Sequence, residues 1–292
     1  MDEMTIFGEV LFDCFPSGER VLGGAPFNVA WHLQAFGRRP RFVSRVGEDA
    51  AGREVRRAMQ DWGMDCGGVQ EDPRRPTGEV RVSLRQGEPS YEIVDDVAYD
   101  FIDSAALKDG GGRLLYHGSL CLRHADSRAA LERLKGQGPR LVFMDVNLRP
   151  PWWEREALLR WCDGADWVKL NETELQELHG TSRDLYAAAL SFHQRHALRG
   201  LVVTRGERGA LGFGADQRPV EVAPVEALEV IDTVGAGDAL SAVLLLGLQL
   251  GWPLDLSLER AQAFASALVG RRGATVGDAA FYRPFIEAWS LG

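Results

Sequence analysis

The sequence predicts a three-layer α/β fold in which helices flank a mostly parallel central sheet that carries a small β lid. Short β-branched runs alternate with amphipathic segments through most of the chain, as in parallel strands joined by helical crossovers. One region departs from this alternation and has the pattern of an antiparallel hairpin. The length of 292 residues, with 45% apolar residues, suits one large domain over residues 1–292.

The expected elements follow one another along the chain. Strands are expected at Thr5–Val10, Arg41–Arg45, Arg113–His117, Leu141–Val146, Asp166–Lys169 and Gly200–Thr204. Helices are expected at Pro26–Phe36, Gly52–Trp62, Asp126–Lys135, Asn171–His179, Arg183–His196, Gly237–Leu250 and Leu258–Gly270.

The lid is expected from two segments, residues 11–22 and 77–99. The second holds alternating residues in GEVRVSL, then a Gly-containing turn and SYEIV, with no helix between them. The first has its own Pro-Ser-Gly turn. Such a piece over the end of a sheet would exclude water from a site beneath it.

Composition and charge exclude several functions. A net charge of −9 disfavours nucleic-acid binding. The four cysteines show no C-x-x-C pair, which disfavours a disulfide framework or a zinc site and suggests a reducing cytoplasmic setting. The acidic start MDEMTIFGEV does not resemble a secretory signal, and the apolar stretch 239–252 is too short and interrupted to span a membrane.

The segment DTVGAGDAL at residues 232–240 carries the strongest chemical signal. Gly235, Ala236 and Gly237 let the backbone approach a ligand and turn its N–H groups toward one point, at the start of a long apolar helix. Such a helix N-terminus favours the negative charge of a phosphoryl group. Asp238 follows directly and would lie beside it. The alternative interpretation is a tight glycine turn with Asp238 as a helix cap.

A second glycine-rich segment, GGAPFNVAWHLQAFG, lies at residues 23–37. Gly23 and Gly24 permit a close approach to a ligand, Pro26 suits a first helical turn, and Asn28 offers a donor and an acceptor for a sugar hydroxyl. A helix entry with Asn28 facing solvent explains the segment equally well. Neither a P-loop nor a dinucleotide G-x-G-x-x-G fingerprint is present, which disfavours Walker-type NTPases and dehydrogenases.

Together the two segments resemble the PfkB, or ribokinase-like, family of carbohydrate kinases. Members carry a Gly-Gly-x-x-x-Asn segment near the N-terminus and a D-T-x-G-A-G-D signature near the C-terminus, and this chain has both in that order. The resemblance extends over essentially the whole chain and implies a ribokinase-like fold.

The resemblance also implies residues for nucleotide and metal. The family's Asn-x-x-Glu motif, which organises Mg²⁺ and phosphate, corresponds to Asn171 and Glu174; from the residues alone the segment is a helix start with an acidic first turn. The T-x-G-x-x-G nucleotide loop corresponds to Thr204, Gly206 and Gly209, where a strand–turn–strand is the alternative.

Further matches concern cation and sugar. A monovalent-cation site, typically for K⁺, is implied at Asp232 and Thr233, and a sugar-binding aspartate at Asp13, although a surface turn is nearly as good an explanation for Asp13.

The stretch from Asp145 to Arg149 has the D-x-N-x-R pattern of fructokinase-like members. Arg149 follows a strand and is expected to face the sugar or the γ-phosphate, with Lys169 as a weaker candidate for such a role.

The expected function is an ATP- and Mg²⁺-dependent sugar kinase in which Asp238 receives the proton of the attacked hydroxyl. D-fructose is the first expected substrate; 2-keto-3-deoxygluconate, ribose or a nucleoside are alternatives. A catalytically silent sugar or nucleotide sensor on the same fold is the alternative from another class. Since several members of the family pair through their lids, the resemblance also implies a homodimer.

Overall fold

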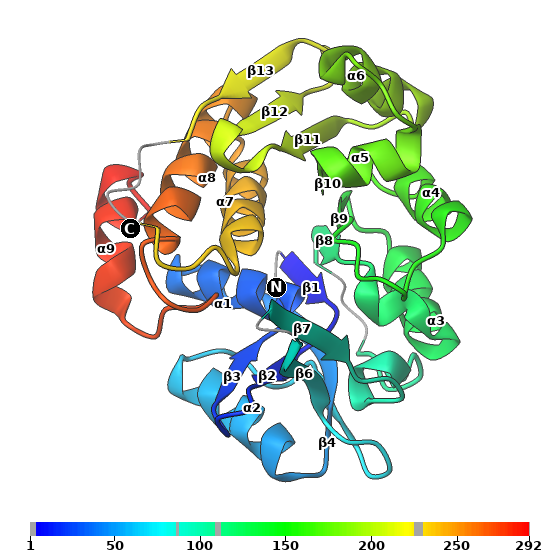
Figure 1. Cartoon of the computed structure of the whole chain (residues 1–292), viewed down its shortest axis with the longest axis vertical. Coiled ribbons are helices and arrows are strands. Elements are labelled where there is room, and N and C mark those ends of the chain that lie inside the picture. Colours follow the sequence, from blue (N-terminus) through cyan, green and yellow to red (C-terminus); the bar gives the residue numbers. More distant parts are fainter. Residues whose placement is uncertain (1–3, 86–87, 109–111, 225–229, 292) are drawn as a thin grey trace. The chain divides into compact units, whose positions relative to one another are not determined.

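The chain contains two compact units in a computed structural model that describes residues 4–85, 88–108, 112–224 and 230–291 (Figure 1). The first unit comprises Met1–Gly112, Cys121–Gly138 and Thr275–Gly292. The second comprises Arg113–Leu120 and Pro139–Ala274.

The second unit is built on six adjacent strands. Four are parallel and lie in chain order: β8 (Leu114–His117), β9 (Leu141–Asp145), β10 (Trp167–Asn171) and β11 (Gly200–Thr204). Two antiparallel strands, β12 (Ala210–Phe213) and β13 (Pro219–Val222), extend the sheet after a short 3-10 helix η3 (Gly206–Arg208). The carboxyl ends of the parallel strands therefore lie at one edge, where α/β sheets place their ligand sites.

Helices cover both faces of these strands. One face packs against α4 (Arg155–Asp163), α5 (Glu172–His179) and α6 (Leu185–Arg195) through a fully apolar core that includes Leu158, Leu175 and Phe192. The other face carries α7 (Ala236–Leu250) and α8 (Leu254–Leu268), which lie side by side (Figure 1). Nine consecutive residues of α7 are buried, so its N-terminus is held by the core.

The first unit has three parallel strands, β1 (Met4–Phe7), β4 (Arg41–Gly47) and β5 (Val69–Asp72). Its helices are α1 (Ala25–Ala35), α2 (Ala50–Asp61), α3 (Ala125–Gly136) and α9 (Ala279–Ala288), with short 3-10 helices η1 (Ala98–Phe101) and η2 (Leu120–Arg123), the latter at the unit boundary. The C-terminal helix packs on α1: His32 Nδ1 lies 2.9 Å from the Tyr282 hydroxyl, and Phe36 packs edge-on against the same ring.

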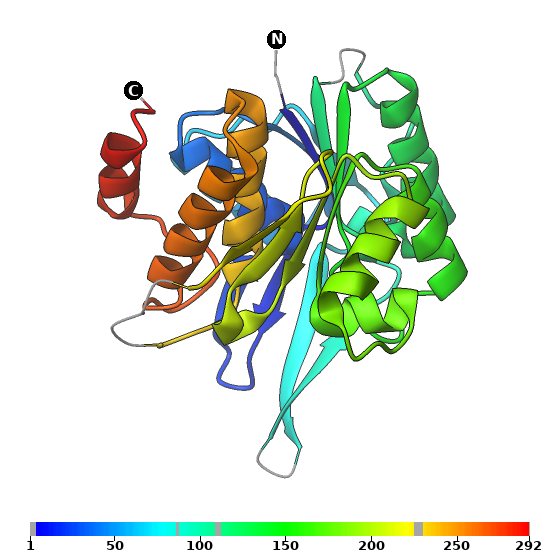
Figure 2. The same ribbon diagram turned by 90° about the horizontal axis from the view of Figure 1, so that it is seen from above.

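A separate four-stranded sheet in the first unit is formed from the two segments at which the lid is expected, and it is called the lid sheet here. Its strands are β2 (Leu11–Cys14), β3 (Arg20–Gly23), β6 (Gly78–Arg85) and β7 (Glu88–Ile93), in the order β3-β2-β6-β7. The β6–β7 pair forms a long hairpin (Figure 2), and residues 86–87 of the expected segment lie outside the described residues.

The predicted three-layer α/β class, with its mostly parallel sheet, is confirmed, and several boundaries differ. Strand β1 ends at Phe7 rather than Val10, because Gly8 has φ +149° and turns the chain. The sequence analysis missed α4 and α9. The latter contains Pro284, which argues against a helix by sequence, yet aromatic packing against α1 holds it. In the described ranges, no helix has the length and apolarity needed to cross a membrane.

Candidate active site

The glycine turn before α7 has the geometry of an open helix start. Gly235 is the N-cap residue in the left-handed region (φ +80°), and a Cβ built there would lie 2.5 Å from Ala274 Cα. The α-helical hydrogen bonds begin with Ala239 N–H to Gly235 O at 2.8 Å. The amides of the first turn therefore precede the helical ladder, and Gly237 is exposed while Asp238 is half-buried within that turn. A buried helix with an exposed, uncapped start can bind an anion.

The segment preceding the turn is braced by Asp232. Its Oδ1 accepts the Val234 amide at 3.0 Å, and its Oδ2 accepts the Gly273 amide at 3.0 Å. The Thr233 carbonyl accepts the Ala236 amide at 3.3 Å. This carboxylate thus connects the turn before α7 to the loop after α8, and it fixes the backbone carbonyls of the predicted K⁺ segment.

Asn171 and Glu174 form a reciprocal capping box at the start of α5. Asn171 Oδ1 accepts the Glu174 amide at 2.9 Å, and Glu174 Oε2 accepts the Asn171 amide at 2.8 Å. Glu174 Oε1 accepts the Leu148 amide at 2.7 Å, which joins α5 to the loop after β9. Burial raises the pKa of the Glu174 carboxyl, nearby Asp145 adds to the rise, and the two amide bonds oppose it.

This donor set suits Mg²⁺ by its chemistry. A carboxylate and an amide oxygen are hard ligands, and Mg²⁺ commonly keeps several waters while using few protein groups. Because both Glu174 oxygens already accept backbone amides, the remaining lone pairs fit a hydrated ion.

The predicted nucleotide loop is a tight turn between β11 and β12. Thr204 ends β11 and is half-buried; Gly206 has φ +56° and Gly209 has φ +81°. A Cβ on Gly209 would lie 1.9 Å from the Val222 carbonyl oxygen, so this position requires glycine. Both expected readings, a strand–turn–strand and a nucleotide contact, fit this geometry.

Arg149 lies in the exposed loop after β9. Its guanidinium donates to the carbonyl of Leu148 at 3.0 Å. Asn147 in the same loop adopts φ +42°, a conformation that asparagine tolerates better than most residues. The Arg149 side chain is thus at the carboxyl end of β9, the edge where its predicted role requires it.

Four of the five residues expected to bind the sugar lie in the first unit, and the fifth, Arg149, lies in the second. Asp13 in β2 pairs with Val21, and Leu11 pairs with Gly23, so Asp13 and Gly23 belong to the same face of the lid sheet. Gly24 is the N-cap of α1 with φ +111°. Asn28 is 4% exposed, and its Oδ1 would lie 3.7 Å from a Cβ on Gly23. Asn28 is therefore buried, and the alternative interpretation, a helix entry with Asn28 facing solvent, is wrong on this point.

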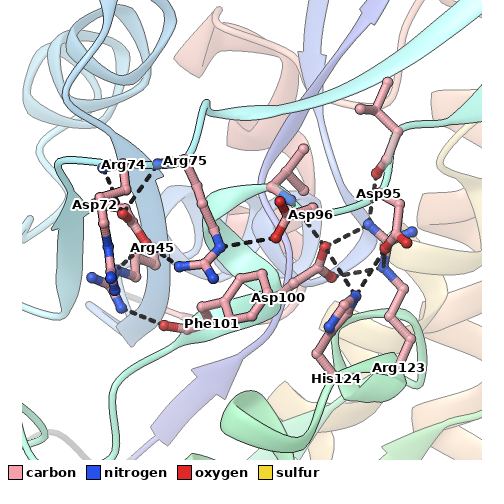
Figure 3. Close-up of polar contacts among 12 residues, drawn as sticks. Arg45, Asp72, Arg74, Arg75, Asp95, Asp96, Asp100, Phe101, Arg123 and His124 are labelled. Carbon is pink, nitrogen blue, oxygen red and sulfur yellow. Dashed lines mark hydrogen bonds and ion pairs between the residues drawn. The ribbon is translucent and has the colours of Figure 1, made fainter.

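Two arginines hold the base of the lid hairpin (Figure 3). Arg75, before β6, pairs with Asp96, after β7, at 3.0 Å. Arg123 binds Asp100 with two 2.7 Å contacts and donates to the carbonyl of Val94 at 2.6 Å. The two ends of the hairpin are therefore joined to each other, and the end after β7 is also joined to Arg123.

One cluster beside this base has candidate metal ligands, Asp95, Asp100 and His124, whose ligand atoms lie within 4.8 Å of one another. The cation in this cluster is the Arg123 guanidinium, which binds both oxygens of Asp100. His124 Nε2 lies 2.8 Å from Asp95 Oδ1. These contacts account for the cluster without a metal.

The structure places the predicted residues in two groups. The second unit holds the phosphoryl turn, the Asn171 motif, the nucleotide loop and Arg149; the first holds the sugar segment. The sequence analysis missed Ser241, whose hydroxyl lies 2.8 Å from Asp145 Oδ2. Its only sequence signal is its place four residues after Gly237, one helical turn along α7.

Comparison with known proteins bears on the identity of the chain. Residues 14–279 match the profile of the pfkB family carbohydrate kinases. The fructokinase of Salmonella typhimurium is 33% identical over 272 residues, which cover 87% of each chain.

Two solved structures of the Vibrio cholerae O395 fructokinase are similar as well. The form with fructose, ADP and calcium has a TM-score of 0.81 at 27% identity, covering 97% of this chain and 98% of that one. A double mutant with fructose, ADP and a potassium ion has a TM-score of 0.79 at 28% identity, with the same coverage. The resemblance predicted from the two glycine segments is confirmed, and the chain belongs to the pfkB family of carbohydrate kinases.

Proposed function

We propose that the protein is a fructokinase that transfers the γ-phosphoryl group of ATP to a hydroxyl of D-fructose. The observation that carries the proposal is the uncapped glycine start of α7 with Asp238 in its first turn. The names of the relatives, fructokinases from Salmonella typhimurium and Vibrio cholerae, support the choice of sugar. A non-catalytic sensor would not need a carboxylate beside an open anion site.

In the proposed reaction the protein positions the attacking hydroxyl and stabilises the charge on the transferring phosphoryl group. In the turn formed by Gly235, Ala236 and Gly237, the amides that lie outside the helical ladder stabilise negative charge on the transferring phosphoryl group; that of Ala236 shares its hydrogen with the Thr233 carbonyl. Asp238 orients the attacking hydroxyl and takes its proton late, as a loose transition state allows. Asn28 and Asp13 bind sugar hydroxyls, because the amide can donate to and accept from a polyol and the carboxylate can accept from two hydroxyls.

The nucleotide is assigned to the rest of the second unit. Thr204, Gly206 and Gly209 contact ATP, Arg149 offsets phosphate charge, and Asn171 with Glu174 would hold Mg²⁺ through its waters. Bound Mg²⁺ would neutralise charge that develops on the phosphates.

A monovalent cation and a second subunit belong to the proposal too. The potassium ion in the Vibrio cholerae double mutant supports a K⁺ site formed by the carbonyls near Asp232 and Thr233. The family resemblance supports a homodimer formed through the lid sheet. All four cysteines are free thiols, which suits a reducing cytoplasm.

A panel of acceptors in a coupled ADP-release assay tests the function. D-fructose, D-glucose, D-ribose, 2-keto-3-deoxygluconate and adenosine would be compared at equal concentrations, and kcat/KM should be highest for D-fructose. Asp238→Asn should lower kcat by about 10³-fold, because general-base groups contribute about 10²–10⁴-fold, while ATP affinity stays near that of the wild type.

Asp255→Asn is the matched control. Asp255 lies in the first turn of α8 and is exposed, so the same change there should leave kcat unaltered. ATP binding without ADP release for any acceptor would favour the sensor. A higher kcat/KM for another acceptor would support the kinase activity but contradict the choice of D-fructose as the substrate.

A further inference from the structure

Three buried side chains behind the first turn of α7 form one polar network. Lys169 Nζ lies 2.9 Å from Asp145 Oδ1 and 2.7 Å from Asp145 Oδ2. The hydroxyl of Ser241 lies 2.8 Å from Asp145 Oδ2. Each of the three residues is 6% exposed or less. The network therefore connects β9, β10 and α7 inside the second unit.

The sheet register brings the two charges together. Asp145 and Lys169 are partners in the parallel pairing of β9 and β10, so their side chains leave the same face of the sheet. A buried ion pair is weak evidence for stability, because desolvation of two charges offsets most of their attraction. Stability alone therefore does not explain why the ion pair is buried here, and its contact with α7 suggests a role in positioning that helix.

Ser241 carries the network to the phosphoryl turn. Its hydroxyl also lies 3.0 Å from the carbonyl oxygen of Gly237, one helical turn earlier. A hydroxyl has one hydrogen, so Asp145 and Gly237 share it. A Cβ built on Gly237 would lie 3.5 Å from Lys169 Nζ, which brings the ammonium close to the backbone of the same turn.

We propose that Asp145, Lys169 and Ser241 are positioning residues for phosphoryl transfer, which hold the backbone of α7 at Gly237 and so fix the direction of the amides of the turn. The inference rests on the proposed function, since that function assigns the turn to the phosphoryl group. Lys169 orients Asp145 through the ion pair, Asp145 accepts the hydrogen bond of Ser241, and the Ser241 hydroxyl also contacts the carbonyl oxygen of Gly237. Donors stabilise a transition state most when they are oriented beforehand, so a turn that is free to shift would lose rate before it loses binding.

Ser241→Ala tests the link that joins the ion pair to α7, because it leaves Asp145 and Lys169 in place. We expect kcat to fall about 10-fold, since small misplacement of catalytic groups lowers the rate, with the KM values for ATP and sugar within about 2-fold of the wild type. In calorimetry, the affinity for ADP with aluminium fluoride should fall by a similar factor while that for ADP alone is kept, since only the former imitates the transferring group.

Ser257→Ala is the matched control. Ser257 is buried in the first turn of α8, and its hydroxyl donates to the Pro253 carbonyl at 2.9 Å, the same helical contact that Ser241 makes with Gly237. Ser257→Ala should lose a small amount of thermal stability, as Ser241→Ala should, and keep its kcat. Tyr116→Phe is a second control, because it removes another hydroxyl, 3.3 Å from Asp145 Oδ2, without changing α7; its kcat should stay within about 2-fold.

Equal kcat for Ser241→Ala and Ser257→Ala would overturn the positioning role, as would a full reproduction of the effect by Tyr116→Phe. A wild-type enzyme that phosphorylates no acceptor would contradict the proposed function instead. The aluminium fluoride measurement would then decide the positioning role by itself, because it requires no turnover.

Discussion

The start of α7 and the start of α2 differ in what the amides of the first helical turn can bind. Asp49 caps α2 from an extended conformation, and its side chain accepts the Gly52 amide at 2.7 Å. Gly235 begins α7 in a left-handed conformation and has no side chain to offer. A helix start that serves the fold satisfies its own amides, whereas one that serves a ligand leaves them to the ligand.

The start of α1, like that of α7, has a glycine with positive φ as its N-cap, but the two starts differ in ψ and in charge. Gly24 has φ +111°, and a Cβ there would lie 2.7 Å from the Glu9 carbonyl oxygen. The first turn of α1 contains no acidic residue, and its polar side chain is Asn28. An uncharged polar group suits the hydroxyls of a sugar, while a carboxylate beside open amides suits proton removal during phosphoryl transfer.

After Asp238→Asn, the largest expected effect comes from closing the start of α7 with Gly235→Ala. The left-handed conformation costs a residue with Cβ about 1–2 kcal/mol, and the new Cβ would overlap Ala274, so the turn must move. We expect kcat to fall by about 10²-fold or more, since about 1 Å of misplacement has that effect. ADP-release kinetics and thermal unfolding measure the two consequences.

Gly251→Ala is the control for this variant, at the other end of the same helix. Gly251 has φ +70°, but nothing lies within 4 Å of a Cβ there. It should lose about 1 kcal/mol of stability from backbone conformation alone and keep its kcat. If both variants keep full activity, the turn before α7 does not orient the phosphoryl group.

The second effect concerns the start of α1. Asn28→Ala should raise KM for the sugar by about 10- to 100-fold, because loss of a hydrogen-bonding partner leaves buried polar groups unsatisfied, while KM for ATP stays constant. Gln34→Ala, in the last turn of the same helix, removes a comparable amide that donates to the Gly63 carbonyl and should not change either KM. An unchanged KM for the sugar in Asn28→Ala would make Asn28 a core residue only.

These contrasts also show which parts of the molecule the sequence could predict. The parallel strands follow from short β-branched runs and α7 from one long apolar run. The two glycine segments identified the family, because glycine is required where φ is positive. Gly235 and Gly24 both have such angles. Their signal is local, so one sequence suffices to find it.

Contacts between distant segments were not predictable in the same way. Ser241 lies 96 residues from Asp145 in the chain, and only the packing of α7 on the sheet brings them together. The helix α9 was not predicted for a related reason. Pro284 disfavours a helix locally, but tertiary packing with Phe36 and His32 outweighs this local effect. Local rules describe a turn well and a network poorly.

The smallest expected effect sharpens the comparison at the closed start of α2. Thr77 donates its hydroxyl to Asp49 Oδ1 and its amide to Oδ2, both at 2.8 Å. Burial alone would raise the pKa of the Asp49 carboxyl, but these bonds and that of Gly52 outweigh it and lower the pKa. The resulting stabilisation is present above the unfolded-state pKa of about 3.9 and is lost as the pH falls through the lower folded value.

Thr77→Val removes the bond that the hydroxyl donates to Asp49 and also the bond that it accepts from the Gly47 amide at 3.0 Å. It should lower the free energy of unfolding by about 1–2 kcal/mol at pH 7. Since the bond to Asp49 favours the charged carboxylate, the difference from the wild type should narrow below about pH 4, while the part that comes from Gly47 remains. Urea unfolding at pH 7, 5, 4 and 3 measures it, with the exposed Thr181→Val as control. A difference that stays constant over this range would mean that the Thr77 side chain acts through packing and its bond to Gly47, and not through the charge of Asp49.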